Sequence, residues 1–474
     1  MLCLVLCTTS CTVSVAPAYR IIKESREIQF VSGPSPKLRV RTGYSLENYG
    51  NGDLVSVEVV LPSKKSYGVQ DLLIKLNGHE VSPVELSDES EAEGARRFRI
   101  PFAPVWNQKQ RCDLAIEYTL SSSEDSNKNF ALSSTYFHVV SRDWLPSLQP
   151  PTHVLSPFPA SPERLTRTVQ IPSDFLLLTP GKSRGRTKNG GEVKYRFELR
   201  ESDPAPFIVA GRYMDSCSNR RSCRAVFWTA EPLRVNPAPA EEQVATAWDV
   251  LQKNFGSLEK SSLAPHIVES PGLLHNGDDA PSATPFFGGV LVNPRAMSLG
   301  VNSPDFLDLV ARGLAGNWFG VRIYGPNSAV GMTEGLSDYA VIVIDEARNG
   351  ESTRRKRVSH FLQEYDHACK EAVEKPLIAI TTRDPIEQRR IALAKAPLFF
   401  IALEDAYGED SVRQGLKQLV SLLRGQEVGY QDIRAAIENV TNKDLAPIFR
   451  TWLYSPGIPV EFREKYQAAA ARKN

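Results

Sequence analysis

The sequence lacks an excess of charge of either sign. Its 474 residues include 56 lysines and arginines and 55 aspartates and glutamates, which leave a formal net charge of +1. A protein this close to neutrality has no overall field that would attract a nucleic acid. We therefore expect no nucleic acid among its partners.

Long apolar runs are also missing, since none approaches the roughly 18 residues that a membrane-spanning helix requires. The first 19 residues, MLCLVLCTTSCTVSVAPAY, carry no charged side chain, a composition typical of an export segment. Thr9 and Ser10 precede Cys11 as small residues precede the lipidated cysteine of a bacterial lipoprotein. Thr8 and the absence of a basic leading region depart from that pattern. We expect an exported protein of the cell envelope, periplasmic or anchored through Cys11; a misassigned start codon is the alternative.

Cysteine is scarce after that segment, where only Cys112, Cys217, Cys223 and Cys369 follow. The stretch CSNRRSC could close Cys217 onto Cys223 as a disulfide in an oxidising compartment. Two reduced cysteines in a basic turn are the open alternative. The spacing lacks the paired C-x2-C units of a zinc ribbon, so we do not expect a structural metal there.

The length predicts at least two domains, because one hydrophobic core seldom serves so long a chain. Residues 20–235 alternate apolar and polar side chains in short runs such as LVSVEVVLP and CDLAIEYTL, with turn clusters between them. This pattern predicts an N-terminal antiparallel β domain. The stretch NPAPAEEQ begins the second domain, residues 236–474, where the apolar period changes to about 3.6 residues and predicts mostly helix. One such helix is expected from about Pro304 to Gly320.

Several segments, taken in order, resemble the aminopeptidase N family of gluzincin metallopeptidases (M1-like). They are AWDVLQKNFG, HIVESP, FFGGVLVNP, GLAGNWFG, TEGLSDYA and FRTWLYSPGIPV, and with the β domain the resemblance spans Arg20 to Phe462. It implies a multidomain β plus α/β fold. A saddle-like or sandwich-like β domain would precede a thermolysin-like, mostly helical gluzincin domain. It also raises the expectation of zinc-dependent aminopeptidase activity.

The helix that binds zinc in active members reads H-E-x-x-H-x-W-F-G. Histidines at positions i and i+4 share a helix face and bind the metal, and the glutamate activates its water. Aligning Trp318 with the motif's tryptophan puts Arg312-Gly313-Leu314-Ala315-Gly316 in place of H-E-x-x-H. Arg312, Gly313 and Gly316 therefore occupy degenerate catalytic positions.

The family's third zinc ligand is a glutamate on the next helix, and Glu334 matches it one position closer than usual. We expect Arg312 to turn toward Glu334, so that an arginine–carboxylate pair replaces the metal. The alternative leaves Arg312 in solvent and Glu334 capping a neighbouring turn. We expect no cofactor; zinc would return only with an atypical site, which would include Glu334.

Two further family sites have lost their functional groups. In ALAKAPLFF, Lys395 aligns with a family lysine, which places Leu393 where a tyrosine stabilises the oxyanion. The substrate-binding strand, G-x-M-E-N in the family, aligns with GGVLVNP. That stretch keeps Gly288, Gly289 and Asn293 but lacks the glutamate for the substrate's amino terminus. These three residues with Arg312 and Glu334 form the predicted remnant of the cleft.

A replacement metal site is not evident elsewhere. His360 and His367 are the close histidine pair, but two helical turns separate them, too far for joint ligation. The basic run RRKR, residues 354–357, is expected in a solvated loop; contact with anionic lipid is the alternative.

We therefore expect a non-catalytic, exported relative of zinc aminopeptidases that retains the fold for peptide or protein binding or as a scaffold. An active metallo-aminopeptidase with an atypical metal site is one alternative. An envelope structural or assembly protein is another.

Overall fold

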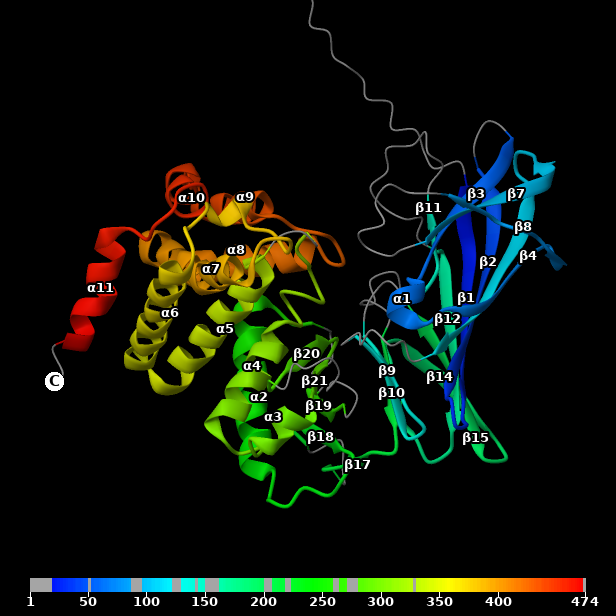
Figure 1. The fold of residues 1–474 in the computed structure, drawn as a ribbon, viewed down its shortest axis with the longest axis horizontal. Coiled ribbons are helices and arrows are strands. Elements are labelled where there is room, and N and C mark those ends of the chain that lie inside the picture. The colour runs from blue at the N-terminus through cyan, green and yellow to red at the C-terminus, as the bar shows by residue number, and fades with distance from the viewer. Residues whose placement is uncertain are drawn as a thin grey trace, which may run out of the picture.

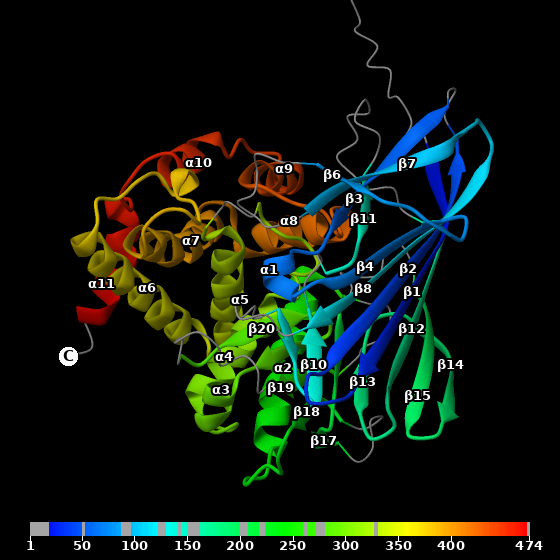
Figure 2. The same ribbon diagram turned by 45° about the vertical axis from the view of Figure 1, so that its right-hand side comes forward.

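The computed structural model describes residues 19–49, 53–86, 96–121, 129–140, 144–149, 162–199, 207–217, 223–258, 264–270, 280–326 and 330–471. Cys11 lies outside these ranges. Figures 1 and 2 show a strand-rich first part beside a mostly helical second part. This confirms the expected fold class of an N-terminal β domain followed by a mostly helical domain. No helix in the described ranges is long and apolar enough to cross a membrane.

An eight-stranded sheet dominates the first part. In spatial order its strands are β14 (Lys182–Asn189), β15 (Glu192–Leu199), β12 (Arg164–Pro172), β1 (Tyr19–Val31), β2 (Lys37–Asn48), β8 (Arg111–Ser121), β4 (Gln70–Leu76) and β5 (His79–Glu80). Along β2, Leu38, Val40 and Tyr44 are buried while Arg39 and Arg41 are exposed. The two-residue period in the sequence thus gives the sheet one core face and one polar face.

Two four-stranded sheets complete this part. The first, in order, is β13 (Leu176–Leu178), β16 (Ile208–Gly211), β10 (Tyr136–Val139) and β9 (Phe130–Leu132); the second is β11 (Ser147–Gln149), β3 (Leu54–Leu61), β7 (Arg96–Trp106) and β6 (Val84–Leu86). A short helix, α1 (Lys64–Tyr67), follows β3. Side chains from all three sheets share one hydrophobic core, which includes Leu38, Val59 and Phe137.

The second part is built on a five-stranded sheet. Its spatial order is β17 (Met214–Asp215), β18 (Val226–Thr229), β19 (His266–Glu269), β21 (Gly289–Val292) and β20 (Ala283–Phe286). Strands β18, β19 and β21 run parallel, and β20 pairs antiparallel with β21 at one edge. Strands β17 and β18 join this sheet although they precede the boundary predicted at residue 236. The change in apolar period near residue 236 therefore marks the first helix of this part, α2 (Ala238–Phe255), whereas its first strand begins earlier, at Met214.

Helices cover this sheet and continue beyond it. They are α2 (Ala238–Phe255), α3 (Pro294–Ser298), α4 (Pro304–Ala315), α5 (Met332–Asn349), α6 (Glu351–Glu371), the 3-10 turn η3 (Leu377–Ala379), α7 (Ile386–Tyr407), α8 (Glu409–Leu422), α9 (Tyr430–Thr441), α10 (Ala446–Leu453) and α11 (Val460–Ala471). Figure 1 places the five-stranded sheet between α2–α5 and the strand-rich part, with α11 at the far end.

The two parts meet through buried side chains. His138 of β10 shares a hydrogen bond of 2.8 Å with Ser270, which directly follows β19. Phe207, just before β16, has its ring centroid 5.1 Å from that of Phe286 in β20. Phe207 and Val209 belong to the same hydrophobic core as the helical part. The β domain therefore contacts the five-stranded sheet at β20 and just after β19.

Candidate functional site

Helix α4, which aligns with the zinc-binding helix, begins as the sequence predicts but ends early. The Ser303 hydroxyl accepts a hydrogen bond from the Phe306 N–H, and Pro304 occupies the first turn, so the helix has a regular N-cap. It ends at Ala315, with Gly316 as its C-cap, rather than continuing to Gly320. The second-histidine position thus lies at the end of the helix, where the chain turns away.

The edge of the sheet fills the space in front of the two glycines. A Cβ atom at Gly313 would lie 2.5 Å from Cγ2 of Val290 and 3.1 Å from Cβ of Ala283. At Gly316 it would lie 2.8 Å from Cγ of Pro285. These separations are far below van der Waals contact, so β20 and β21 leave no room for side chains here. Catalytic glutamate and histidine side chains could not stand at these positions in this backbone.

The residue after the glycines holds the hairpin against the helix. The Asn317 side chain accepts a hydrogen bond from the Gly288 N–H at 2.8 Å and donates one to the Gly289 carbonyl at 3.0 Å. Gly288 needs its positive φ of 86° at this turn. A Cβ at Gly289 would lie 2.2 Å from the His266 carbonyl oxygen. Both glycines of the predicted cleft remnant therefore shape the β20–β21 turn.

Asn293, another member of the predicted remnant, is a buried cap. Its side chain accepts hydrogen bonds from the N–H groups of Ala296, at 2.8 Å, and Ser282, at 3.0 Å, and donates to the Ala280 carbonyl at 2.9 Å. Its polar atoms are thus used in starting α3 and closing the preceding loop.

Arg312 does not pair with Glu334, which corrects the predicted contact. Its Nε and Nη2 instead each lie 2.8 Å from an oxygen of Asp338, one helical turn further along α5. Glu334 is exposed and accepts a hydrogen bond from the Thr333 hydroxyl at 3.1 Å. Among the described residues no ion pair joins Arg312 to Glu334. Arg312 thus forms an arginine–carboxylate pair, but the predicted acidic partner is wrong.

Asp338 is an unusual carboxyl group because it is buried. Burial raises its pKa from 3.8 to about 6, while the Arg312 guanidinium opposes that rise and Asp308 and Glu334 add to it. At neutral pH the ion pair is intact. Arg312 itself stays half-exposed, with 46% of its side chain accessible.

Arg312 and Asp338 line a cavity of about 630 Å³. Helices α4, α5, α6 and α7 surround it, and its other lining residues are Asp308, Val341, Arg357, His360, Phe361, Glu364, His367, Ala368, Arg390, Leu393 and Ala394. Leu393, which aligns with the family's tyrosine, thus faces the same space as Arg312. Glu334, Gly288, Gly289 and Asn293 do not line it, so of the predicted remnant only Arg312 reaches this cavity.

Lys395, which aligns with the family's lysine, is fully buried on α7. Its Nζ donates to Glu374 at 2.7 Å and to the Ser455 carbonyl at 2.9 Å. Burial lowers the Lys395 pKa, and the ion pair with Glu374 opposes that change. Glu374 also accepts a hydrogen bond from the Gly457 N–H at 2.6 Å. The lysine ties α7 to the turn before α11 and serves packing.

The histidine pair on α6 lines the cavity without forming a ligand set. His360 and His367 are exposed, and Nε2 of His367 lies 3.5 Å from Glu371. Within the described ranges, no three histidine, cysteine, aspartate or glutamate side chains are placed to hold a metal ion. A zinc ion therefore does not fit the residues that this region presents.

The aromatic landmark after α4 is packed in the core. Trp318 and Phe319 are almost completely buried, and the Trp318 indole N–H donates to the Gly256 carbonyl at 2.7 Å. The Trp318 ring meets Trp248 of α2 edge to face, with 5.0 Å between centroids. These residues are core residues that position α4 against α2.

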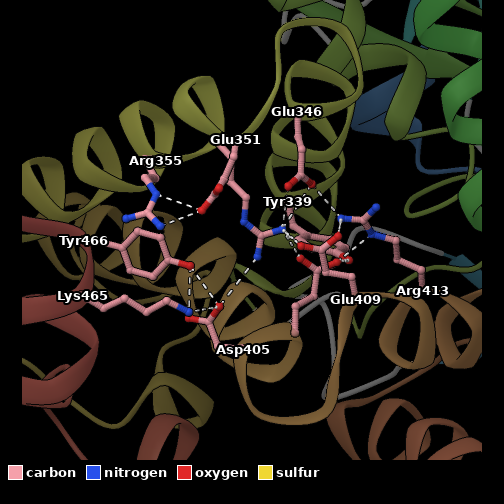
Figure 3. Close-up of polar contacts among 11 residues, drawn as sticks. Tyr339, Glu346, Glu351, Arg355, Asp405, Glu409, Arg413, Lys465 and Tyr466 are labelled. Carbon is pink, nitrogen blue, oxygen red and sulfur yellow. Dashed lines mark hydrogen bonds and ion pairs between the residues drawn. The ribbon is translucent and has the colours of Figure 1, made fainter. Parts of the chain in front are cut away.

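A separate cluster of buried charges lies among α5, α6, α7 and α8 (Figure 3). Arg354, expected in a solvated loop, lies in α6 and donates to Glu404 at 2.6 Å. Arg413 donates to Glu404 at 2.7 Å and to Glu346 at 2.8 Å, and the Tyr339 hydroxyl donates to Glu404 at 2.6 Å. No local pattern in the sequence indicates this cluster, since its members are spread from Tyr339 to Arg413. We call it the Glu404 cluster.

Of the two alternatives left open for Cys217 and Cys223, a disulfide or two reduced cysteines, the structure contains the disulfide. Cys217 and Cys223 are bonded, and among the described cysteines Cys112 and Cys369 are free. The bridge closes the segment between β17 and β18 at the edge of the five-stranded sheet.

The sequence matches no protein-family model and no curated protein. Solved structures nevertheless share its fold. The M1 zinc metallopeptidase from Deinococcus radiodurans has a TM-score of 0.63 at 14% identity, covering 94% of this chain and 95% of its own. Native yeast LTA4 hydrolase scores 0.63 at 16% identity, covering 96% and 70%. Aminopeptidase A of Legionella pneumophila, in complex with aspartic acid, scores 0.63 at 15%, covering 94% and 50%. The chain therefore has the fold of the M1 zinc aminopeptidases.

Proposed function

We propose that this protein is a non-catalytic relative of the zinc aminopeptidases that uses the retained fold to bind a peptide or a protein segment. One observation carries the proposal: Val290, Ala283 and Pro285 occupy the space in which catalytic side chains on α4 would stand. The shape of the backbone supports kinship, but activity has to be argued from the site. The site favours a binding function because a cavity persists beside positions that cannot carry the chemistry.

Zinc content and hydrolysis test this proposal together. The purified chain is exposed to excess zinc, desalted and analysed by elemental mass spectrometry, and then assayed with aminoacyl para-nitroanilides. We expect near-zero zinc and no hydrolysis above the buffer rate. About one zinc per chain with hydrolysis that a chelator abolishes would overturn the proposal and favour an atypical active site.

We also propose that the protein is exported to the cell envelope, with a lipid anchor on Cys11. The bond between Cys217 and Cys223 supports an oxidising compartment, where disulfides persist. The uncharged first 19 residues support an export segment. Cys11→Ser should move the protein from the membrane to the soluble fraction of a bacterial host. An unchanged distribution would contradict the anchor.

A further inference from the structure

The cavity beside α4 has two arginines whose hydrogen-bonding capacity is only partly used. Arg312 contacts Asp338 through Nε and Nη2, and Arg390 of α7 contacts Glu371 through Nη1 alone, at 3.2 Å. Among the described residues, Nη1 of Arg312 and both Nε and Nη2 of Arg390 have no partner. The Arg390 side chain is 56% exposed. Two walls of the cavity therefore present unused guanidinium N–H groups.

The other charged groups of the cavity are more fully engaged. Arg357 uses all three nitrogens, with Nε 2.6 Å from Asp345 and both Nη atoms on Asp308. Asp338 is bound by Arg312, so the aspartates of the lining are already neutralised by arginines. Glu364 is the lining carboxylate for which the described residues supply no ion pair. The hydrogen-bonding groups that remain unused in the cavity are thus mainly arginine N–H donors, which would bind an anion.

An apolar strip accompanies these cations. Val341, Phe361, Leu393 and Ala394 line the same cavity from α5, α6 and α7. A volume of about 630 Å³ lies within the range of small-ligand sites and would accept two or three amino-acid residues. Guanidinium groups bind carboxylates in a planar, two-pronged geometry. The lining therefore fits a molecule with a carboxylate at one end and an apolar side chain near it.

We propose that this cavity binds the free C-terminal end of a short peptide, with Arg312 and Arg390 holding its carboxylate and Phe361 and Leu393 contacting its side chains. The inference rests on the proposed peptide-binding function. It gives the ligand a polarity opposite to that of an aminopeptidase, which holds the amino terminus.

Blocked peptides test the polarity directly. The tripeptide Leu-Phe-Ala is titrated into the full chain by isothermal calorimetry in three forms: unmodified, N-acetylated and C-terminally amidated. The acetylated form should bind as the unmodified form does, and the amide about tenfold more weakly or worse, because it loses the charge-assisted hydrogen bonds. If acetylation abolishes binding and amidation does not, the proposed polarity is wrong. If no form binds, the proposed peptide-binding function itself fails.

Arginine variants locate the contact. Arg390→Gln should weaken binding of the unmodified peptide by about tenfold and leave binding of the amide unchanged. The substitution and the amidation each remove the same contact between arginine and carboxylate. Arg355→Gln is the matched control, since Arg355 is an α6 arginine that pairs with Glu351, its one ion-pair partner among the described residues, and lies outside the cavity. Arg390 is exposed, so we expect both variants to keep the thermal midpoint of the parent. Equal loss for peptide and amide with Arg390→Gln would overturn the assignment of the carboxylate to this residue.

Discussion

At the scale of single residues, Gly313 and Gly316 set how closely α4 approaches the sheet. Glycine in a helix interior costs about 1 kcal/mol relative to alanine. This cost applies to Gly313 inside α4, where a Cβ would collide with Val290; at Gly316, the C-cap, a Cβ would collide with Pro285. The two glycines thus allow the edge of the sheet to lie against the helix.

Gly313→Ala should therefore destabilise the protein although alanine is the better helix former. The new methyl group must displace Val290, and overpacking of this kind costs roughly 1–3 kcal/mol. Thermal unfolding followed by circular dichroism at the helix band measures the change. Gly191→Ala is the control, because a Cβ at Gly191 meets nothing within 4 Å. A Gly313→Ala variant as stable as the parent would show that β21 can shift freely.

A second prediction concerns the contribution of Asp338 to the pH dependence of stability. Its folded-state pKa of about 6 exceeds the ordinary value of 3.8, so the folded state holds the proton more tightly than the unfolded state. Its contribution to stability is then fully present below about pH 4 and is lost as the pH rises through about 6. Asp338→Asn should remove this part of the pH dependence, measured as thermal midpoints from about pH 4 to about pH 7.

Asp384→Asn supplies a control of opposite sign. Hydrogen bonds from Lys375 and Thr381 lower the Asp384 pKa from 3.8 to about 2. The stability that Asp384 contributes is therefore present throughout the tested range and is lost only as the pH falls toward about 2. Its asparagine variant should keep the parent's slope between about pH 4 and about pH 7. The same slope in the parent and in Asp338→Asn would contradict the assignment.

At the scale of elements, the Glu404 cluster joins α5, α6, α7 and α8. Arg354 and Arg413 both donate to Glu404, whose side chain is inaccessible to solvent. Removing the Glu404 carboxylate leaves two guanidinium groups without their shared partner in a buried site. Figure 3 also shows Asp405 with Lys465 and Tyr466, which attach α11 to the same region.

Glu404→Ala should accordingly destabilise the helical part by about 3–5 kcal/mol, the usual cost of breaking a buried ion pair. Urea unfolding followed at the helix band measures it. Glu351→Ala, which breaks the exposed pair with Arg355 on α6, should leave the midpoint where it is. Equal urea midpoints for Glu404→Ala and Glu351→Ala would show that the Glu404 cluster does not stabilise the packing of these helices.

The sequence predicted elements better than the contacts between them. The position of α5 in the second domain and the N-terminus of α4 follow from local periodicity and capping, which the sequence displays directly. Strand β20 was missed because its four residues include Pro285, which is rare inside strands. The predicted partner of Arg312 is wrong because Glu334 and Asp338 lie one turn apart on the same face of α5. Only the position of α5 along its axis relative to α4 decides between them, and that position depends on packing between distant segments.

At the scale of the whole molecule, the chain has the fold of the M1 zinc aminopeptidases. The TM-scores of 0.63 describe the path of the chain and do not report on side chains. Phe207 of the β domain contacts the edge strand β20, His138 bonds Ser270 after β19, and Asn317, just after α4, bonds the β20–β21 turn. Both parts of the protein thus hold the sheet in front of Gly313 and Gly316, so placing ligand side chains there should not by itself open the space.

Restoring the metal motif tests that argument. Arg312→His, Gly313→Glu and Gly316→His together rebuild H-E-x-x-H on α4. We expect a less stable protein with near-zero zinc by elemental mass spectrometry, because the new glutamate and histidine would compete for space with Val290 and Pro285. Arg312→His alone controls for the loss of the Asp338 ion pair. If the triple variant instead held about one zinc per chain at parental stability, the sheet edge would have to be movable.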